Sequence, residues 1–88
     1  MTSVAVVSSM LFVAPAAAAQ NDAARAFRLD NSGQHDEAID LYRQVLARDS
    51  RSYDAHYGIA RALDLTGNYP EAREHFAKAI ELAPDAGS

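Results

Sequence analysis

The sequence predicts an all-α fold of two antiparallel helical hairpins, and three observations support that class. Gly33 and Gly67 stand 34 residues apart (67 − 33), a period typical of stacked helical units. Apolar residues recur at intervals of three and four, as they do on one face of an α-helix. The composition combines 49 % hydrophobic residues and recurrent alanine with few glycines and prolines, which suits closely packed helices better than sheet or disorder.

The repeat extends beyond the two glycines. Six residues of one unit recur as identical residues in the next, because Ala26, Leu29, Asp30, Gly33, Glu37 and Ala38 align with Ala60, Leu63, Asp64, Gly67, Glu71 and Ala72. Six identities in one register indicate a true duplication of one supersecondary unit.

The first hairpin is expected to have helices near residues 21–31 and 35–48. Gly33 lies between them, where one helix must end and the chain reverse. The apolar positions of the second helix are Ala38, Leu41, Tyr42, Val45 and Leu46.

The second hairpin is expected to have helices near residues 53–66 and 69–82. Ser52 is a suitable N-cap for the first, and Gly67 separates the two. Pro70 falls in the first turn of the last helix, where a missing N–H is tolerated, and Pro84 lies where that helix should end. The apolar positions are His56, Ile59, Ala60, Leu63, Ala72, Phe76, Ala79, Ile80 and Ala83.

These residues resemble the tetratricopeptide repeat family along both units. The second unit has small residues at Ala60, Ala72 and Ala79, apolar Ile59 and Leu63, Tyr69 after the turn, Phe76 and the terminating Pro84. The first unit matches through Leu29, Gly33, Ala38, Tyr42 and Leu46, and departs at Asp22, Arg25, Val45 and Ser50. The resemblance implies a right-handed α-solenoid, with a domain at 20–86, repeat one at about 19–52, repeat two at about 53–86, and a tail at 87–88.

The resemblance also implies a concave groove lined by the first helix of each unit. Carried over residue by residue, the groove set is Asp54, Tyr57, Arg61, Asp64 and Leu65 in the second unit and Ala23, Phe27, Asp30 and Asn31 in the first. Tyr57 and Arg61 are four residues apart on one face and are of the types enriched at interface anchors. The alternative is an ordinary solvated face with Tyr57 lying on Arg61. The basic clamp with which some family members hold a C-terminal carboxylate is not expected, because Asp54 and Asp64 flank Arg61.

The N-terminal segment resembles a secretory signal peptide. Val4 to Ala19 carries no charge and runs from an apolar core through Pro15 to Ala17-Ala18-Ala19, an Ala-x-Ala pattern. We expect residues 1–19 to direct export, with cleavage near Ala19 and a periplasmic or secreted product. A retained membrane anchor and an apolar helix packed on the domain are the alternatives.

The charged and polar residues do not predict catalysis or nucleic-acid binding. Acidic residues outnumber basic ones by 12 to 8, and the basic residues are dispersed. There is no cysteine, and His35, His56 and His75 lack metal-ligand spacing, so neither metal nor other cofactor is expected. His35 and His56 are instead expected to fill core or rim positions, and Glu71 and His75 to form a surface pair.

The sequence therefore favours a non-enzymatic, exported module that binds a peptide or partner protein in its groove. Two hairpins leave the outer face of the last helix, around Phe76, Ile80 and Ala83, without a covering helix. A self-associating unit that dimerises through that face is the alternative, and so is an N-terminal fragment of a longer exported repeat protein. A membrane contact is expected only if the N-terminal segment is retained.

Overall fold

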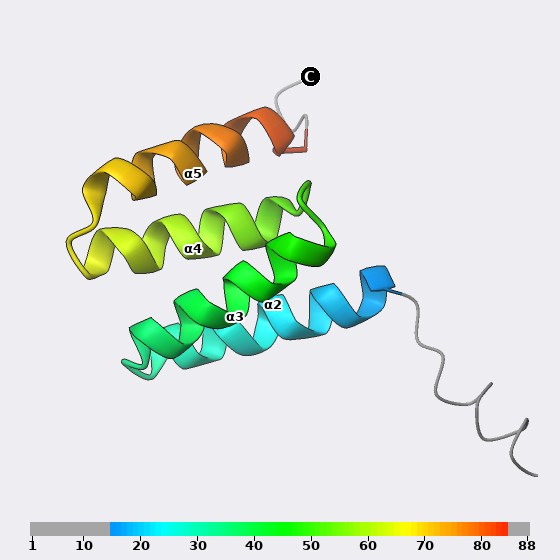
Figure 1. Ribbon diagram of the computed structural model, residues 1–88, viewed down its shortest axis with the longest axis horizontal. Helices are drawn as coiled ribbons and strands as arrows, with labels where there is room; N and C mark the ends of the chain where they lie inside the picture. Colours follow the sequence, from blue (N-terminus) through cyan, green and yellow to red (C-terminus); the bar gives the residue numbers. More distant parts are fainter. Residues whose placement is uncertain (1–14, 85–88) are drawn as a thin grey trace, which may run out of the picture.

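A computed structural model describes residues 15–84 as four helices (Figure 1). They are α2 (Pro15–Asn31), α3 (His35–Arg48), α4 (Tyr53–Leu65) and α5 (Tyr69–Leu82). Both ends of α5 are shifted from those of α3 by 34 residues (69 − 35 and 82 − 48), so the structure repeats with the period of the sequence. The prediction of an all-α solenoid of two helical hairpins is confirmed. The signal-like core Val4–Val13 and the tail 87–88 lie outside the described residues.

The bounds of α3, α4 and α5 agree with the predicted ranges to within one residue, but α2 begins six residues before position 21. Alanines, the best helix formers, fill positions 16–19, and Pro15 stands where a proline costs a helix no hydrogen bond. Ala19 is only 2 % exposed and belongs to the core. The alanine run is thus the first turn of a packed helix in this structure.

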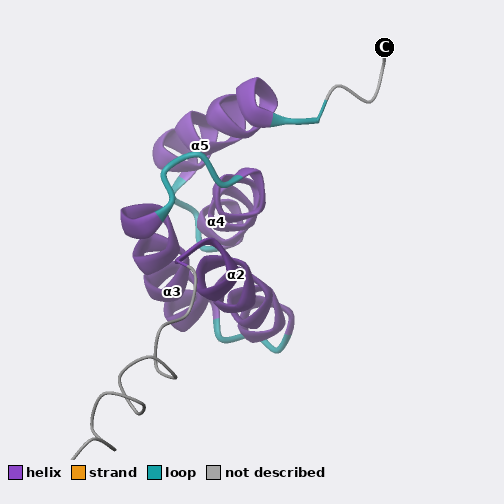
Figure 2. Cartoon of the chain, turned by 90° about the vertical axis from the view of Figure 1, so that its right-hand side faces the viewer, coloured by secondary structure: helices purple, strands orange, loops and turns teal. Residues whose placement is uncertain are grey.

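The four helices pack in chain order, each against the next. α2 contacts α3, α3 contacts α4 and α4 contacts α5, while α2 also contacts α4 directly. Figure 2 shows α2 and α4, the first helices of the two units, next to each other on one side of the stack, with α3 on the other side. The surface formed by α2 and α4 is called the groove face below.

Both hairpin turns depend on a glycine with positive φ. Gly33 and Gly67 have φ angles of 88° and 90°, in the region that L-residues with a Cβ rarely adopt. Beyond each glycine the chain turns back on the helix it has left, with the backbone N–H of Gln34 donating to Leu29 O and that of Asn68 donating to Leu63 O. These bonds satisfy carbonyls that the helix end leaves unpaired.

The start of α4 is fixed by the predicted cap. The Ser52 side chain accepts a hydrogen bond of 3.1 Å from the backbone N–H of Ala55. The chain thus leaves the first unit and re-enters a helix within four residues, which keeps α4 close to α3.

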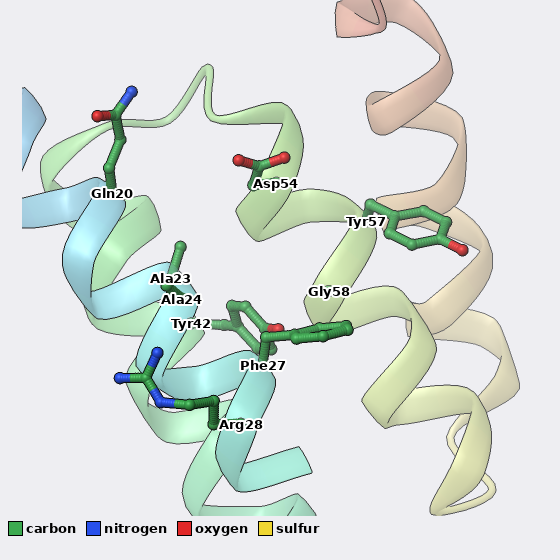
Figure 3. Close-up of a pocket in the computed structure, with 9 residues that line it drawn as sticks. All are labelled: Gln20, Ala23, Ala24, Phe27, Arg28, Tyr42, Asp54, Tyr57 and Gly58. Carbon is green, nitrogen blue, oxygen red and sulfur yellow. The ribbon is translucent and has the colours of Figure 1, made fainter. Parts of the chain in front are cut away.

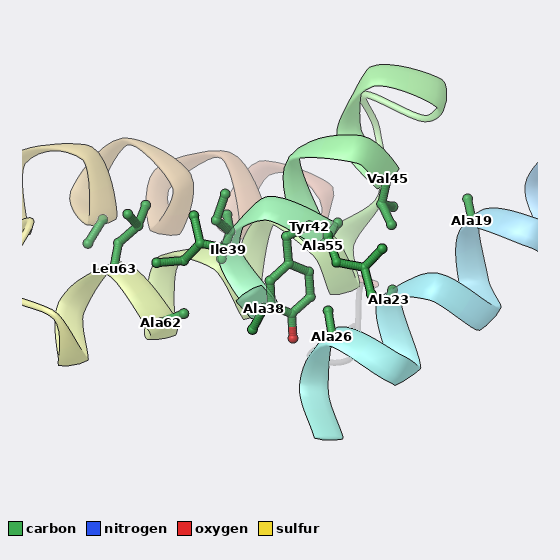
Figure 4. Packing of buried hydrophobic residues seen from close by; sticks show 13 residues of the cluster. Ala19, Ala23, Ala26, Ala38, Ile39, Tyr42, Val45, Ala55, Ala62 and Leu63 are labelled. Carbon is green, nitrogen blue, oxygen red and sulfur yellow. The ribbon is translucent and has the colours of Figure 1, made fainter. Parts of the chain in front are cut away.

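The core is built mainly from alanines and a few large side chains (Figure 4). Tyr42, Ile59 and Val45 are the largest fully buried side chains. Small residues at the contacts let the helix axes approach closely, and the large ones fill the space between layers. The buried alanines are Ala19, Ala23, Ala26, Ala38, Ala55, Ala60, Ala62, Ala72 and Ala79.

A chain of polar contacts connects the two units. The Arg43 guanidinium donates to both Glu71 carboxylate oxygens, at 2.6 and 3.2 Å, and so joins α3 to α5. Glu71 lies 3.5 Å from His75 Nε2, so the predicted pair exists. His75 Nδ1 is 3.0 Å from His56 Nδ1, and His56 Nε2 is 2.9 Å from the Ser50 carbonyl oxygen.

The Ser50 carbonyl at the end of this series of contacts determines which histidine nitrogen atoms carry a proton. Because a carbonyl only accepts, His56 Nε2–H donates to Ser50, and the other nitrogen of a neutral His56 accepts from His75 Nδ1–H. His56 is 8 % exposed and fills the core, as expected. Burial lowers the pKa of His75, and the positive charge that His56 carries when it is protonated lowers it further, while Glu71 acts in the opposite direction. The hydrogen bond from Arg43 lowers the pKa of Glu71.

One departure of the first unit from the family pattern also has a structural explanation. Asp22, at a position that is usually bulky and apolar, accepts a hydrogen bond of 2.5 Å from Arg48 Nη2 and so links α2 to α3. The pair is partly exposed, and its contribution to stability is therefore small.

Lowering the pH should destabilise the fold through His75. Since its folded pKa lies below the unfolded value of about 6.5, the unfolded chain takes up the proton first, and stability falls as the pH drops through that value. We expect a lower melting temperature at about pH 5.5 than at about pH 7.5, and a smaller difference in His75→Gln. Glu71 does not account for the difference, because its stabilising charge is lost only at more acidic pH. If the melting temperatures of the original protein and of His75→Gln depend equally on pH, His75 is not the cause of the acid destabilisation.

Candidate functional site

Most of the predicted groove residues lie on the surface of α2 and α4. Phe27 and Tyr57 are 44 % and 45 % exposed, values high for aromatic side chains, and Leu65 is 57 % exposed. Asp54 and Asp64 are also exposed. Asn31 is exposed at the end of α2, whereas Arg61 is partly covered.

Asp30 does not belong to this open surface. Its residue is 3 % exposed, and its Oδ1 lies 2.5 Å from His35 Nδ1. His35 opens α3 immediately after the turn and reaches back to the end of α2, so Asp30 holds the hairpin corner together. The placement of Asp30 among the groove residues is therefore wrong, because a local partner across the turn buries its carboxylate.

The groove face contains a recess of about 340 Å³ (Figure 3). Four of the predicted residues line it: Ala23, Phe27, Asp54 and Tyr57. Five others line it that the sequence pattern did not assign to the groove: Gln20, Ala24, Arg28, Tyr42 and Gly58. Arg61, Asp64 and Leu65 are not among the lining residues. The recess thus brings together residues of α2, α3 and α4.

The recess exists because several lining positions have little or no side chain. Gly58 lies in the middle of α4, and a Cβ there would overlap the ring end of Tyr42. Tyr42 reaches from α3 across Gly58 to the floor of the recess (Figure 3). Ala23 and Ala24 keep the opposite side shallow. A glycine inside a helical pattern costs about 1 kcal/mol relative to alanine, and this is the signal by which the sequence could have marked Gly58 as a special position.

The aromatic residues pack differently from the alternative that placed Tyr57 on Arg61. The Arg61 guanidinium lies over the Phe27 ring, 5.5 Å from its centroid, and so joins α4 to α2. The Tyr57 ring stacks on Tyr53, with centroids 6.0 Å apart, and meets the edge of Phe76 at 6.1 Å. Tyr57 is therefore held by two aromatic neighbours while half of its surface stays open.

Tyr42 contributes the one polar group on the floor of the recess. The residue is 1 % exposed, and burial, followed by the negative charge of Asp30, raises its pKa to about 12. Its hydroxyl therefore keeps its proton at neutral pH. Within residues 15–84 no side chain forms a hydrogen bond with its oxygen, and that oxygen is not completely shielded from solvent. We therefore place the hydroxyl at the border of the recess, which Tyr42 lines.

The first hairpin has a second, more polar hollow of about 250 Å³. Its residues come from α2 and α3 and are Asp22, Arg25, Leu29, Glu37, Asp40, Leu41 and Gln44. Three of these seven residues are acidic, and none is aromatic.

Within residues 15–84, no three histidine or acidic side chains converge in the manner of metal ligands. No helix in the same range has the combined length and apolarity of a membrane span.

Comparisons with known proteins agree with the repeat geometry. The profile of the tetratricopeptide repeat matches residues 31–88. Protein bimA of Emericella nidulans is 37 % identical to this chain over 51 residues, which make up 58 % of this chain and 6 % of that protein. The chain thus spans a small part of this relative's length. Since the profile covers more than half of the chain and the helices recur with the same period, the chain belongs to the tetratricopeptide repeat family.

Proposed function

We propose that this protein is an interaction module that holds an extended segment of a partner protein on its groove face. Repeats of this family generally mediate protein–protein interaction and are non-enzymatic. The observation that carries the proposal here is the recess between α2 and α4, flanked by the half-exposed rings of Phe27 and Tyr57.

The energetics of the groove face favour a protein partner. Large aromatic side chains gain much free energy when their exposed surface is buried, and tyrosine and arginine are enriched among residues that dominate binding. Tyr57 is fixed by Tyr53 and Phe76, so it loses little conformational freedom on binding. Asp54, Asp64 and Leu65 extend the surface along α4 and supply polar and apolar contacts at its rim.

We also propose that residues 1–19 direct export to the periplasm or the exterior. The support is the uncharged apolar segment followed by the alanine run. Cleavage after Ala19 would remove the first turn of α2 together with the buried Ala19 side chain, and the mature helix would begin near Gln20.

Tyr57 should carry much of the affinity for a peptide ligand. Random dodecapeptides displayed on phage can be selected on the protein, and the dissociation constant of the best synthetic peptide measured by calorimetry. We expect Tyr57→Ala to raise the dissociation constant of that peptide by about tenfold or more, since truncating a central aromatic anchor typically costs about 2 kcal/mol or more.

Tyr69→Ala is the matched control for this experiment. Tyr69 is 57 % exposed at the start of α5, outside the recess, so its loss should leave affinity within about twofold, as expected for a residue remote from the contact. Circular dichroism must show that both variants keep their helices. A peptide that tolerates Tyr57→Ala but not Tyr69→Ala would place the binding surface elsewhere.

Export predicts a definite N-terminus. Protein recovered from the cell envelope or the medium should begin near Gln20 when sequenced from its N-terminus. Soluble, folded protein that stays in the cytoplasm with Met1 intact would refute the proposed signal.

A further inference from the structure

We propose that the recess is an anchor site for one bulky, uncharged apolar side chain of a partner peptide, and that the Tyr42 hydroxyl donates a hydrogen bond to the peptide carbonyl beside it. This inference rests on the proposed function and names the chemistry that the groove face selects. Three properties of the recess support it.

The first property is its size and wall chemistry. A volume of about 340 Å³ lies at the lower end of the range found for ligand pockets, roughly 300–1,000 Å³. Ala23, Ala24 and Gly58 leave the space open, and Phe27 and Tyr57 are its exposed aromatic lining residues. Such a recess matches one large side chain of a peptide.

The second property is its charge. Arg28 and Asp54 line the recess and extend from different helices, as Figure 3 shows. Their formal charges cancel, so the recess gives neither a cationic nor an anionic side chain a net attraction. Burial of a charged group among apolar walls without a dedicated partner is unfavourable. An uncharged apolar side chain is therefore preferred.

The third property is the Tyr42 hydroxyl. The residue is 1 % exposed, its ring end and hydroxyl oxygen lie against Gly58, and it is one of the residues that line the recess. Since no side chain among the described residues accepts from this donor, a water molecule in the recess would satisfy it in the free protein. A ligand that displaces the water must replace its hydrogen bond. Every peptide residue offers a backbone carbonyl as acceptor, so a peptide that inserts a side chain here can supply one.

The proposal can be tested with small probes that need no known partner. N-acetyl-leucinamide offers an apolar side chain with flanking carbonyls, whereas N-acetyl-glycinamide, N-acetyl-lysinamide and N-acetyl-glutamic acid amide keep the carbonyls and change the side chain. Binding to the full chain is followed by the amide NMR signals of Ala24, Tyr57 and Gly58. The leucine probe should bind at least about fivefold more tightly than the other three, in line with burial of its side chain.

Two variants separate the side-chain space from the hydrogen bond. Ala24→Leu fills the recess from an exposed helix position and should abolish binding of the leucine probe, while Ala47→Leu, on an exposed part of α3 outside the recess, should not change it. Tyr42→Phe removes only the hydroxyl. It should weaken binding of the leucine probe by about threefold to tenfold, the value of one neutral hydrogen bond. Unchanged NMR spectra away from the recess show that each variant is folded.

The outcomes distinguish this inference from the proposed function. Equal affinity of the leucine and glycine probes, or full affinity in Ala24→Leu or Tyr42→Phe, would overturn the anchor site. If Tyr57→Ala weakens binding of the selected dodecapeptide but Ala24→Leu does not, the groove face binds peptides and the proposal that the recess anchors a side chain fails. If the leucine probe binds as expected but no peptide is selected, the anchor stands and the proposed function fails.

Discussion

The contact between the Tyr42 ring and Gly58 is the constraint on which the rest of this structure depends. Tyr42 belongs to the second helix of one unit and Gly58 to the first helix of the next, so the contact joins the repeats. Because Gly58 has no Cβ, α4 lies close enough to α3 for the ring to be almost completely buried. Glycine inside a helix is unfavourable by itself, and here the closer packing offsets that cost.

The same contact connects stability to the groove face. Tyr42 fills the space between the units with its ring and ends in the recess with its hydroxyl. The polar chain from Arg43 through Glu71, His75 and His56 links the units through different side chains. Apolar packing and these ion and hydrogen-bond contacts therefore fix the position of α4 relative to α2, and that position sets the distance between Phe27 and Tyr57 across the recess.

Much of the fold could be predicted from the sequence, because the deciding signals are local. Gly33 and Gly67 mark the turns, Ser52 caps α4, and the apolar period fixes the buried faces of the helices. The start of α2 was missed because an alanine run suits both a signal cleavage site and a helix. The site was harder, since it depends on contacts between helices: Asp30 is buried by His35 across a turn, and Arg61 lies on Phe27 of another helix. Tyr42 has the pattern of a core residue, and only its position over Gly58 shows that its hydroxyl reaches the groove face.

The free energy of unfolding of Gly58→Ala tests the central contact most directly, because close packing of Tyr42 on Gly58 predicts the sign of the change in stability. At an unconstrained helix position this substitution would stabilise the protein by up to about 1 kcal/mol. Here the added Cβ would overlap the end of a ring that is 1 % exposed, so we expect a loss of about 1–3 kcal/mol in denaturant unfolding. A Gly58→Ala protein as stable as the original, or more stable, would contradict the close packing of Tyr42 on α4 and the recess that depends on it.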